Sequence, residues 1–150
     1  MKRVVFLLIP AVLLVVWGCS SRTDSEIDAR KVVLNFLRAM EKSDTTAVAH
    51  YLDFETLLAQ IGTDYELLPD KPRIFYNPQE LVNELVTGGL THTRWMSMQK
   101  IVNKSAEAND SALVEVSFMD KDSGTQYYNK FGLRRINAVW KIYSFSVKEP

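Results

Sequence analysis

The sequence has few of the residues that build disulfides, metal sites or nucleic-acid surfaces. Its single cysteine, Cys19, cannot form an intrachain disulfide or a cysteine-rich metal site. The 18 Lys and Arg residues balance the 18 Asp and Glu residues, and without a basic excess we expect no nucleic-acid partner. With 47% hydrophobic and 24% charged residues over 150 positions, the composition is that of one folded domain and excludes a disordered or repetitive chain.

Motifs of several enzyme classes are missing as well. No GxGxxG or GxxxxGK(S/T) loop and no GxSxG turn occurs, so we expect no cofactor. His50 and His92, the only histidines, lack the spacing of a metal site, and none is predicted. His50 lies next to Tyr51 and near Asp53, a set that could supply an acid and a base. Because neighbouring helical residues point in different directions, we assign no catalytic residue.

The N-terminus has the anatomy of an export signal. Lys2 and Arg3 precede residues 4–17, which are uncharged and almost wholly apolar. A membrane-spanning helix usually needs about 20 apolar residues, and Pro10 would remove a backbone donor in the middle of this shorter run. The pattern therefore predicts a cleaved signal peptide over 1–18.

Residues 16–19, Val-Trp-Gly-Cys, resemble the lipobox of bacterial lipoproteins. The resemblance implies that Cys19 is lipidated and becomes the first residue of the mature chain, with 19–24 as the lipidated cysteine and a short tether. Two or more acyl chains hold a protein stably on a bilayer, so the lipid bilayer is the expected partner. Ser20 is not the aspartate that signals retention, which implies the periplasmic face of the outer membrane if the cell has one. We expect localisation in the bacterial cell envelope.

The mature chain begins with helical patterns. Apolar residues at spacings of three and four predict a helix over 26–42, with Ser25 as its N-cap. Asp44 or Thr45 is expected to cap a second helix, which is interrupted near Asp53 and then restarts. Both helices are amphipathic and need a partner surface.

A third helix and four strands follow. Asn77, with proline next and glutamate three residues later, predicts a helix that runs from Pro78 to Gly88 and Gly89. Beyond Thr91 the helical period gives way to extended segments, which predict a four-stranded meander. The expected strands cover 93–104, 111–119, 125–135 and 139–148.

Side-chain alternation predicts how the last strands face. In 111–119 one face is apolar, as expected beneath helices. In 139–148, Tyr143 and Phe145 are expected to share one side and Trp140 the other. A positive φ is sterically unfavourable for Ala138, so we expect a looser turn than the ideal two-residue type.

Helices at the front and an antiparallel sheet behind predict an α+β fold, with the N-terminal helices packed on a curved antiparallel four-stranded sheet. Residues 74–80, Ile-Phe-Tyr-Asn-Pro-Gln-Glu, and the late run 131–142 make the chain similar to the cystatin-like, nuclear-transport-factor-2-like superfamily. More narrowly, it resembles small bacterial lipoproteins of unknown function with such a domain. The resemblance implies a single cone-shaped domain over 25–150, with a cavity that relatives leave empty, fill with a ligand, use in catalysis or use in dimerisation.

Three functions remain open at this point. We expect a membrane-anchored, non-enzymatic envelope protein that binds a small apolar ligand or an envelope protein. The alternatives are an acid–base enzyme of the isomerase or dehydratase type and a structural homodimer. The expected ligand-binding residues are aromatic side chains placed to face a cavity: Tyr51, Trp95, Tyr127 and Phe131.

Overall fold

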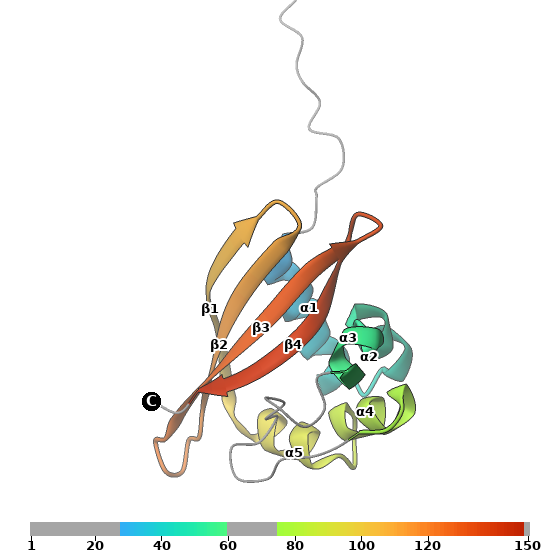
Figure 1. Ribbon diagram of the computed structural model, residues 1–150. Coiled ribbons are helices and arrows are strands. Elements are labelled where there is room, and N and C mark those ends of the chain that lie inside the picture. The colour runs from blue at the N-terminus through green and yellow to red at the C-terminus, as the bar shows by residue number, and fades with distance from the viewer. Residues whose placement is uncertain (1–27, 60–74, 149–150) are drawn as a thin grey trace, which may run out of the picture.

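The computed structural model describes residues 28–59 and 75–148, and in them helices come first and strands follow (Figure 1). This order confirms the predicted α+β fold class. The described helices are α1 (Ala29–Glu41), α2 (Thr45–Tyr51), α3 (Phe54–Ala59), α4 (Pro78–Leu85) and α5 (Leu90–Ser97). The described strands are β1 (Gln99–Ala108), β2 (Ser111–Met119), β3 (Gln126–Ile136) and β4 (Val139–Lys148).

Aspartate side chains begin each of the first three helices. Asp28, Asp44 and Asp53 each accept a hydrogen bond from the backbone N–H three residues later, at 2.6, 2.9 and 3.4 Å. Such caps satisfy donors that the first helical turn leaves unpaired. The predicted second helix, its cap at Asp44 and its restart at Asp53 are therefore confirmed. The expectation that Ser25 caps the first helix is wrong, because Asp28 is the N-cap of α1, and Ser25 itself lies outside the described residues.

The prediction of a strand over 93–104 is wrong in its first half. Residues Leu90–Ser97 form α5, and β1 begins only at Gln99. Thr91 and Trp95, four residues apart, lie on one face of α5 and are 0% and 3% exposed. Burial of this face against the core overrides the β-branched and aromatic composition that favoured a strand.

A buried carboxylate fixes the start of α5. Glu84, in α4, accepts hydrogen bonds from the backbone N–H and the hydroxyl of Thr91, at 2.8 and 2.9 Å. Gly89 lies so close to the backbone of Glu84 that a Cβ there would meet the Glu84 carbonyl oxygen at 2.0 Å. The pair of glycines that ends one helical pattern therefore also allows the next helix to begin.

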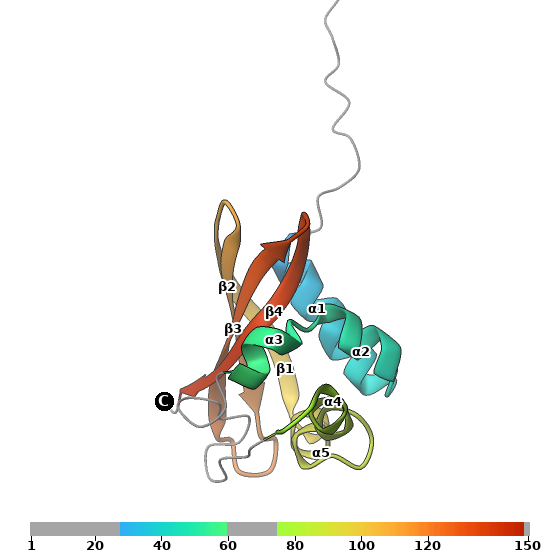
Figure 2. The ribbon, with the colours of Figure 1, turned by 45° about the vertical axis from the view of Figure 1, so that its right-hand side comes forward.

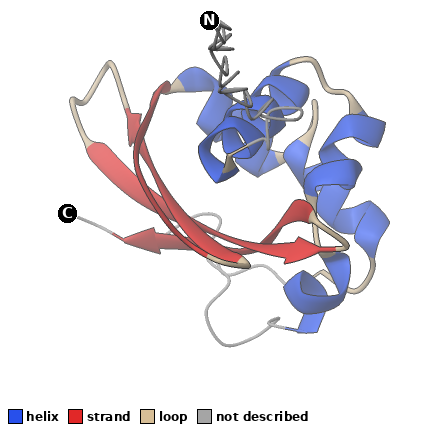
Figure 3. Cartoon of the chain, turned by 90° about the horizontal axis from the view of Figure 1, so that it is seen from above, coloured by secondary structure: helices blue, strands red, loops and turns tan. Residues whose placement is uncertain are grey.

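The four strands form one antiparallel sheet in the order β1-β2-β3-β4. The predicted strands 111–119 and 139–148 match β2 and β4, and 125–135 is displaced by one residue from β3. Figures 2 and 3 show the helices gathered on one side of a curved sheet. Short antiparallel connections make this meander the simplest topology for the sequence.

A bulge in β4 changes which side chains face the helices. The pairing of β3 with β4 shifts between residues 132 and 133, which leaves Tyr143 as an extra residue in β4. Phe145 therefore lies on the same side as Ile142 and Trp140, and these three are 2%, 0% and 4% exposed. The expectation that Tyr143 and Phe145 share a side, opposite Trp140, is wrong.

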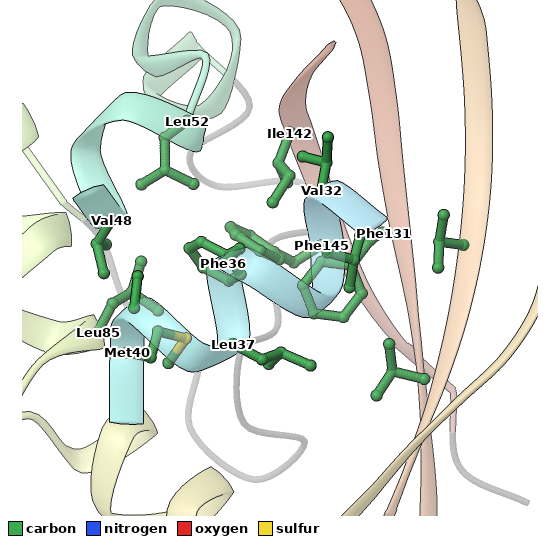
Figure 4. Packing of buried hydrophobic residues seen from close by; sticks show 14 of the residues in the cluster. Val32, Phe36, Leu37, Met40, Val48, Leu52, Leu85, Phe131, Ile142 and Phe145 are labelled. Atoms are coloured by element: carbon green, nitrogen blue, oxygen red, sulfur yellow. The ribbon is translucent and has the colours of Figure 1, made fainter. Parts of the chain in front are cut away.

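Aromatic rings fill the space between α1 and the sheet (Figure 4). The ring of Phe36, on α1, lies 6.2 Å from that of Phe131 and 5.9 Å from that of Phe145. Trp95 approaches the same group from α5, 5.8 Å from Phe131 and 4.8 Å from Phe118. These edge and tilted contacts add to the burial of large apolar surfaces, so this part of the cone is a packed core.

The chain between α2 and α3 lies along the outer edge of β4. The backbone N–H of Asp53 donates to the carbonyl of Ile142 at 2.9 Å, next to a parallel bridge between Leu52 and Ile142. Arg134 of β3 reaches the buried carboxylate of Asp53 at 2.5 Å. Asp53 therefore has a structural role, which agrees with its interpretation as a cap.

Candidate functional site

A hollow of about 250 Å³ lies between α1, α2 and the β3–β4 turn. The side chains around it are mostly apolar, with an amide, an imidazole and a phenol among them. The lining residues are Val32, Asn35, His50, Tyr51, Ala138, Val139 and Trp140. We call this hollow the α1–α2 pocket.

The helical wall of the pocket comes from the first half of α1 and the last turn of α2. Val32 and Asn35, three residues apart, are neighbours on the surface of α1. The ring of Tyr51 packs edge-on against Phe36 at 6.5 Å, and that of His50 lies 5.6 Å from Tyr51. Although His50 and Tyr51 are adjacent in sequence, the end of α2 at this point brings both to the pocket.

The opposite wall is the tight turn between β3 and β4. Ile136 pairs with Val139, so Asn137 and Ala138 alone form the loop, with φ values of 51° and 65°. Two positive φ angles define the ideal type I′ hairpin turn, and the expectation of a looser turn is wrong. For Ala138 this backbone region costs about 1–2 kcal/mol, because its Cβ approaches the following carbonyl.

Trp140 forms the floor of the pocket. The side chain is 4% exposed, and its Nε1 atom is buried without a hydrogen-bond partner among the described residues. The guanidinium of Arg135 lies 4.5 Å from the centre of the ring, at a distance typical of a cation–π contact. The pocket therefore combines a rigid aromatic surface with a positive charge close by.

One lysine, Lys141, and one arginine, Arg134, make the contacts on the outer side of the site. The Lys141 Nζ atom donates to the backbone carbonyl of His50, which ties β4 to the last turn of α2. Burial lowers the pKa of Lys141, while the charge of Asp53 raises it and limits the effect. Asp53 is paired with Arg134. These contacts connect the β3–β4 hairpin, which forms one wall of the pocket, to the end of α2, which forms the other.

The four aromatic residues expected to bind a ligand do not gather around one hollow of the described structure. Tyr51 lines the α1–α2 pocket. Trp95 and Phe131 are 3% and 0% exposed inside the packed core. Tyr127 is half-buried, with the Arg94 guanidinium 5.0 Å from its ring centre. Their role in ligand binding stays a prediction.

The sequence interpretation missed most of the pocket lining. Val32 belongs to the regular apolar pattern of its helix, and Asn35 is an ordinary polar neighbour, so neither gives a signal. Ala138 is different, because alanine follows asparagine where a tight hairpin favours glycine. That misfit was visible in the sequence and marks a wall of the pocket.

Metal binding and membrane crossing receive no support from the described residues. Within 28–59 and 75–148, no group of three or more His, Cys, Asp or Glu side chains is arranged to hold a metal ion. His92 instead lies with its Nε2 atom 3.1 Å from the carbonyl oxygen of Met40. Over the same residues, no helix combines the length and hydropathy needed to cross a bilayer.

The outer face of the sheet mixes apolar and polar side chains. Ile101 and Leu113 are 42% and 43% exposed. Beside them the Asn103 amide donates to the Ser117 hydroxyl at 2.6 Å and to the Glu115 carboxylate at 3.2 Å. This face is thus not the continuous apolar surface that was expected of a structural dimer.

Solved structures resemble the described domain, although no family model and no curated protein matches the sequence. A chain whose name begins with Rd1NTF2_05 is 15% identical, with a TM-score of 0.56 over 80% of this chain and 96% of that chain. An NTF2-like protein from Streptomyces avermitilis, whose name suggests a dehydratase, is 17% identical, with a TM-score of 0.53 over 79% of this chain and 91% of that chain.

A third similar structure is an NTF2-like protein of unknown function from Shewanella baltica, which is 14% identical. Its TM-score is 0.51 over 80% of this chain and 89% of that chain. Together these similarities establish that the domain has the NTF2-like fold. At such identities they establish the fold alone, and the function has to come from the site.

Proposed function

We propose that this protein is a lipid-anchored component of the bacterial cell envelope that binds a small apolar ligand without catalysis. The observation that supports binding is the α1–α2 pocket, whose mostly apolar walls enclose about 250 Å³ beside a packed aromatic core. A volume slightly below the usual range for drug-sized ligands suits a small molecule or part of a larger one. The observation that supports anchoring is the lipobox-like stretch ending at Cys19.

Acyl labelling tests the anchor. Cells that express the full chain are grown with a labelled fatty acid, and the wild type is compared with Cys19→Ala. We expect label in the wild type alone, because only the thiol of Cys19 can carry the lipid. Equal labelling of both chains contradicts the anchor.

Blocking the pocket tests ligand binding. The fluorescent apolar probe N-phenylnaphthylamine is titrated into the wild-type chain and into Asn35→Phe. In this variant a phenyl ring replaces the smaller carboxamide and occupies the pocket. We expect at least about ten-fold weaker binding in Asn35→Phe, equivalent to about 1.4 kcal/mol. Lys31→Phe is the matched control, because Lys31 is an exposed residue of the same helix outside the lining. Equal affinities in both variants contradict binding at this pocket.

One observation favours acid–base catalysis as a second candidate function. His50 and Tyr51 both line the pocket, with ring centres 5.6 Å apart, although neighbouring residues of a helix usually point in different directions. An imidazole and a phenol at one apolar wall can together move a proton at a carbon next to a carbonyl.

Deuterium incorporation from D2O into enolisable ketones separates the two functions. Acceleration by the wild type that is lost in both His50→Gln and Tyr51→Phe supports the enzyme. No acceleration, with probe binding intact, supports the binding protein.

A further inference from the structure

The α1–α2 pocket lies at the end of the domain where α1 begins. The backbone N–H of Ala29 donates to the Glu107 carboxylate at 2.9 Å, which places the start of α1 beside the β1–β2 hairpin. Figure 1 shows the β1–β2 and β3–β4 hairpins at this same end. Val32, less than one turn into α1, and the hairpin residues Ala138 and Val139 are part of the pocket lining.

The anchor brings this end close to the membrane. Under the proposed function, on which this inference rests, Cys19 lies in the bilayer surface and residues 20–28 connect it to Ala29. Ten Cα–Cα steps reach at most about 35 Å, even in a fully extended chain. The tether therefore keeps the start of α1 within about 35 Å of the bilayer surface. The pocket lies at this end of the domain, opposite α4 and α5.

The rim of the pocket suits an amphiphile with a negative headgroup. Val139 is 45% exposed and offers an apolar contact at the hairpin tip. Arg134, Arg135 and Lys141 flank the tip on β3 and β4. Arg134 is paired with Asp53, and Lys141 donates to the backbone carbonyl of His50. Asp110 of the β1–β2 turn lies beside Arg135, whose backbone N–H donates to the Asp110 carbonyl at 2.9 Å. The guanidinium of Arg135, 4.5 Å from the centre of the Trp140 ring, thus places a positive charge beside the apolar opening.

We infer that the α1–α2 pocket receives the acyl chain of a single-chain anionic lipid from the adjacent bilayer. The chain lies against the apolar walls and the indole of Trp140, while the headgroup stays near the hairpin cations. An acyl chain is apolar and flexible, so part of it can occupy a pocket of about 250 Å³ with mostly apolar walls.

Two tryptophans make this inference testable in the intact lipoprotein. Removal of the leader takes Trp17 away and leaves Trp140 in the pocket and Trp95 in the core. The lipidated chain is reconstituted in phosphatidylcholine vesicles, and dibromostearate, whose bromines quench indole fluorescence on contact, is added. Trp95→Phe reports on Trp140 alone, and Trp140→Phe reports on Trp95 alone.

We expect saturable quenching of Trp140, relieved by excess unbrominated stearate, and no comparable quenching of Trp95. Equal quenching of the two rings, or none, overturns the inference. Flotation of the chain with the vesicles is measured in the same samples. A chain that does not float contradicts the proposed anchor, whereas a floating chain with unquenched Trp140 contradicts only the lipid ligand.

A matched pair of surface variants tests the entrance. Val139→Asp and Leu90→Asp each replace an apolar residue of nearly equal exposure, 45% and 46%. Val139 lines the pocket, while Leu90 starts α5 at the other end of the domain. A carboxylate beside the acyl path is costly to desolvate and repels the anionic headgroup, so we expect half-saturation to rise at least about ten-fold in Val139→Asp and to stay unchanged in Leu90→Asp. Equal behaviour of both variants overturns the inference.

Discussion

At the scale of single residues, Ala138 combines an unfavourable backbone conformation with a place in the pocket wall. Its φ of 65° lies in the left-handed region, which glycine adopts without steric cost and alanine does not. The turn closes nonetheless, because Ile136 and Val139 pair on either side of it. Strain at a residue that lines a pocket is a reason to connect that residue with function.

Replacing Ala138 by glycine should stabilise the protein. The variant loses the steric cost of the methyl group, and we expect unfolding in urea to require about 1 kcal/mol more free energy. Ala106→Gly, at an exposed strand position of ordinary φ, is the control and should cost about 0.5–1 kcal/mol. Destabilisation of similar size in both variants would show that the turn stores no strain.

At the scale of elements, β4 shows what sequence patterns can and cannot determine. Its limits follow from the turn at 137–138, and they were predicted correctly. The faces of its second half were not, because one extra residue at Tyr143 reverses the alternation beyond it. No local composition marks such a bulge, which arises from the pairing with β3 and the curvature of the sheet.

The bulge gives a clear contrast between two neighbouring aromatic residues. Phe145→Ala should lower the free energy of unfolding by about 3–5 kcal/mol, because a buried ring leaves a cavity in the core. Tyr143→Ala should cost roughly 1 kcal/mol or less, because that half-buried side chain lies on the other face. Denaturant unfolding of both variants measures these free energies. Equal losses of unfolding free energy would indicate that the two rings lie on one face of the sheet.

The same distinction applies to α5 and to the pocket. Helices with a side-chain cap, such as those beginning after Asp44 and Asn77, were predictable from local residues. The start of α5 depends on the Glu84 carboxylate of another helix, so the residues around Leu90 do not by themselves predict that a helix begins there. The pocket likewise joins α1, α2 and a distant hairpin, and its residues become a set only in three dimensions.

At the scale of the whole molecule, stability should be lowest toward the β1 side of the sheet. Residues 104–111, in β1 and its hairpin, are all exposed, whereas β2 and β3 are paired on both sides and line the core. Native-state hydrogen exchange should therefore show the amides of 105–108 opening at lower free energy than those of 129–133. Uniform protection across these two segments would instead show that the sheet opens as one unit.

The edges of the sheet differ in a way that bears on self-association. At β4, residues 52–53 already occupy the middle of the outer edge through the contacts with Ile142. At β1, pairing with β2 is interrupted between Val102 and Ser105, and the described residues place no further strand beyond it. A further copy that pairs along β4 would have to displace residues 52–53 from Ile142, whereas an assembly through two β1 edges ends at two copies. Edge-to-edge assembly is therefore expected to favour pairs of chains joined through β1 over long polymers.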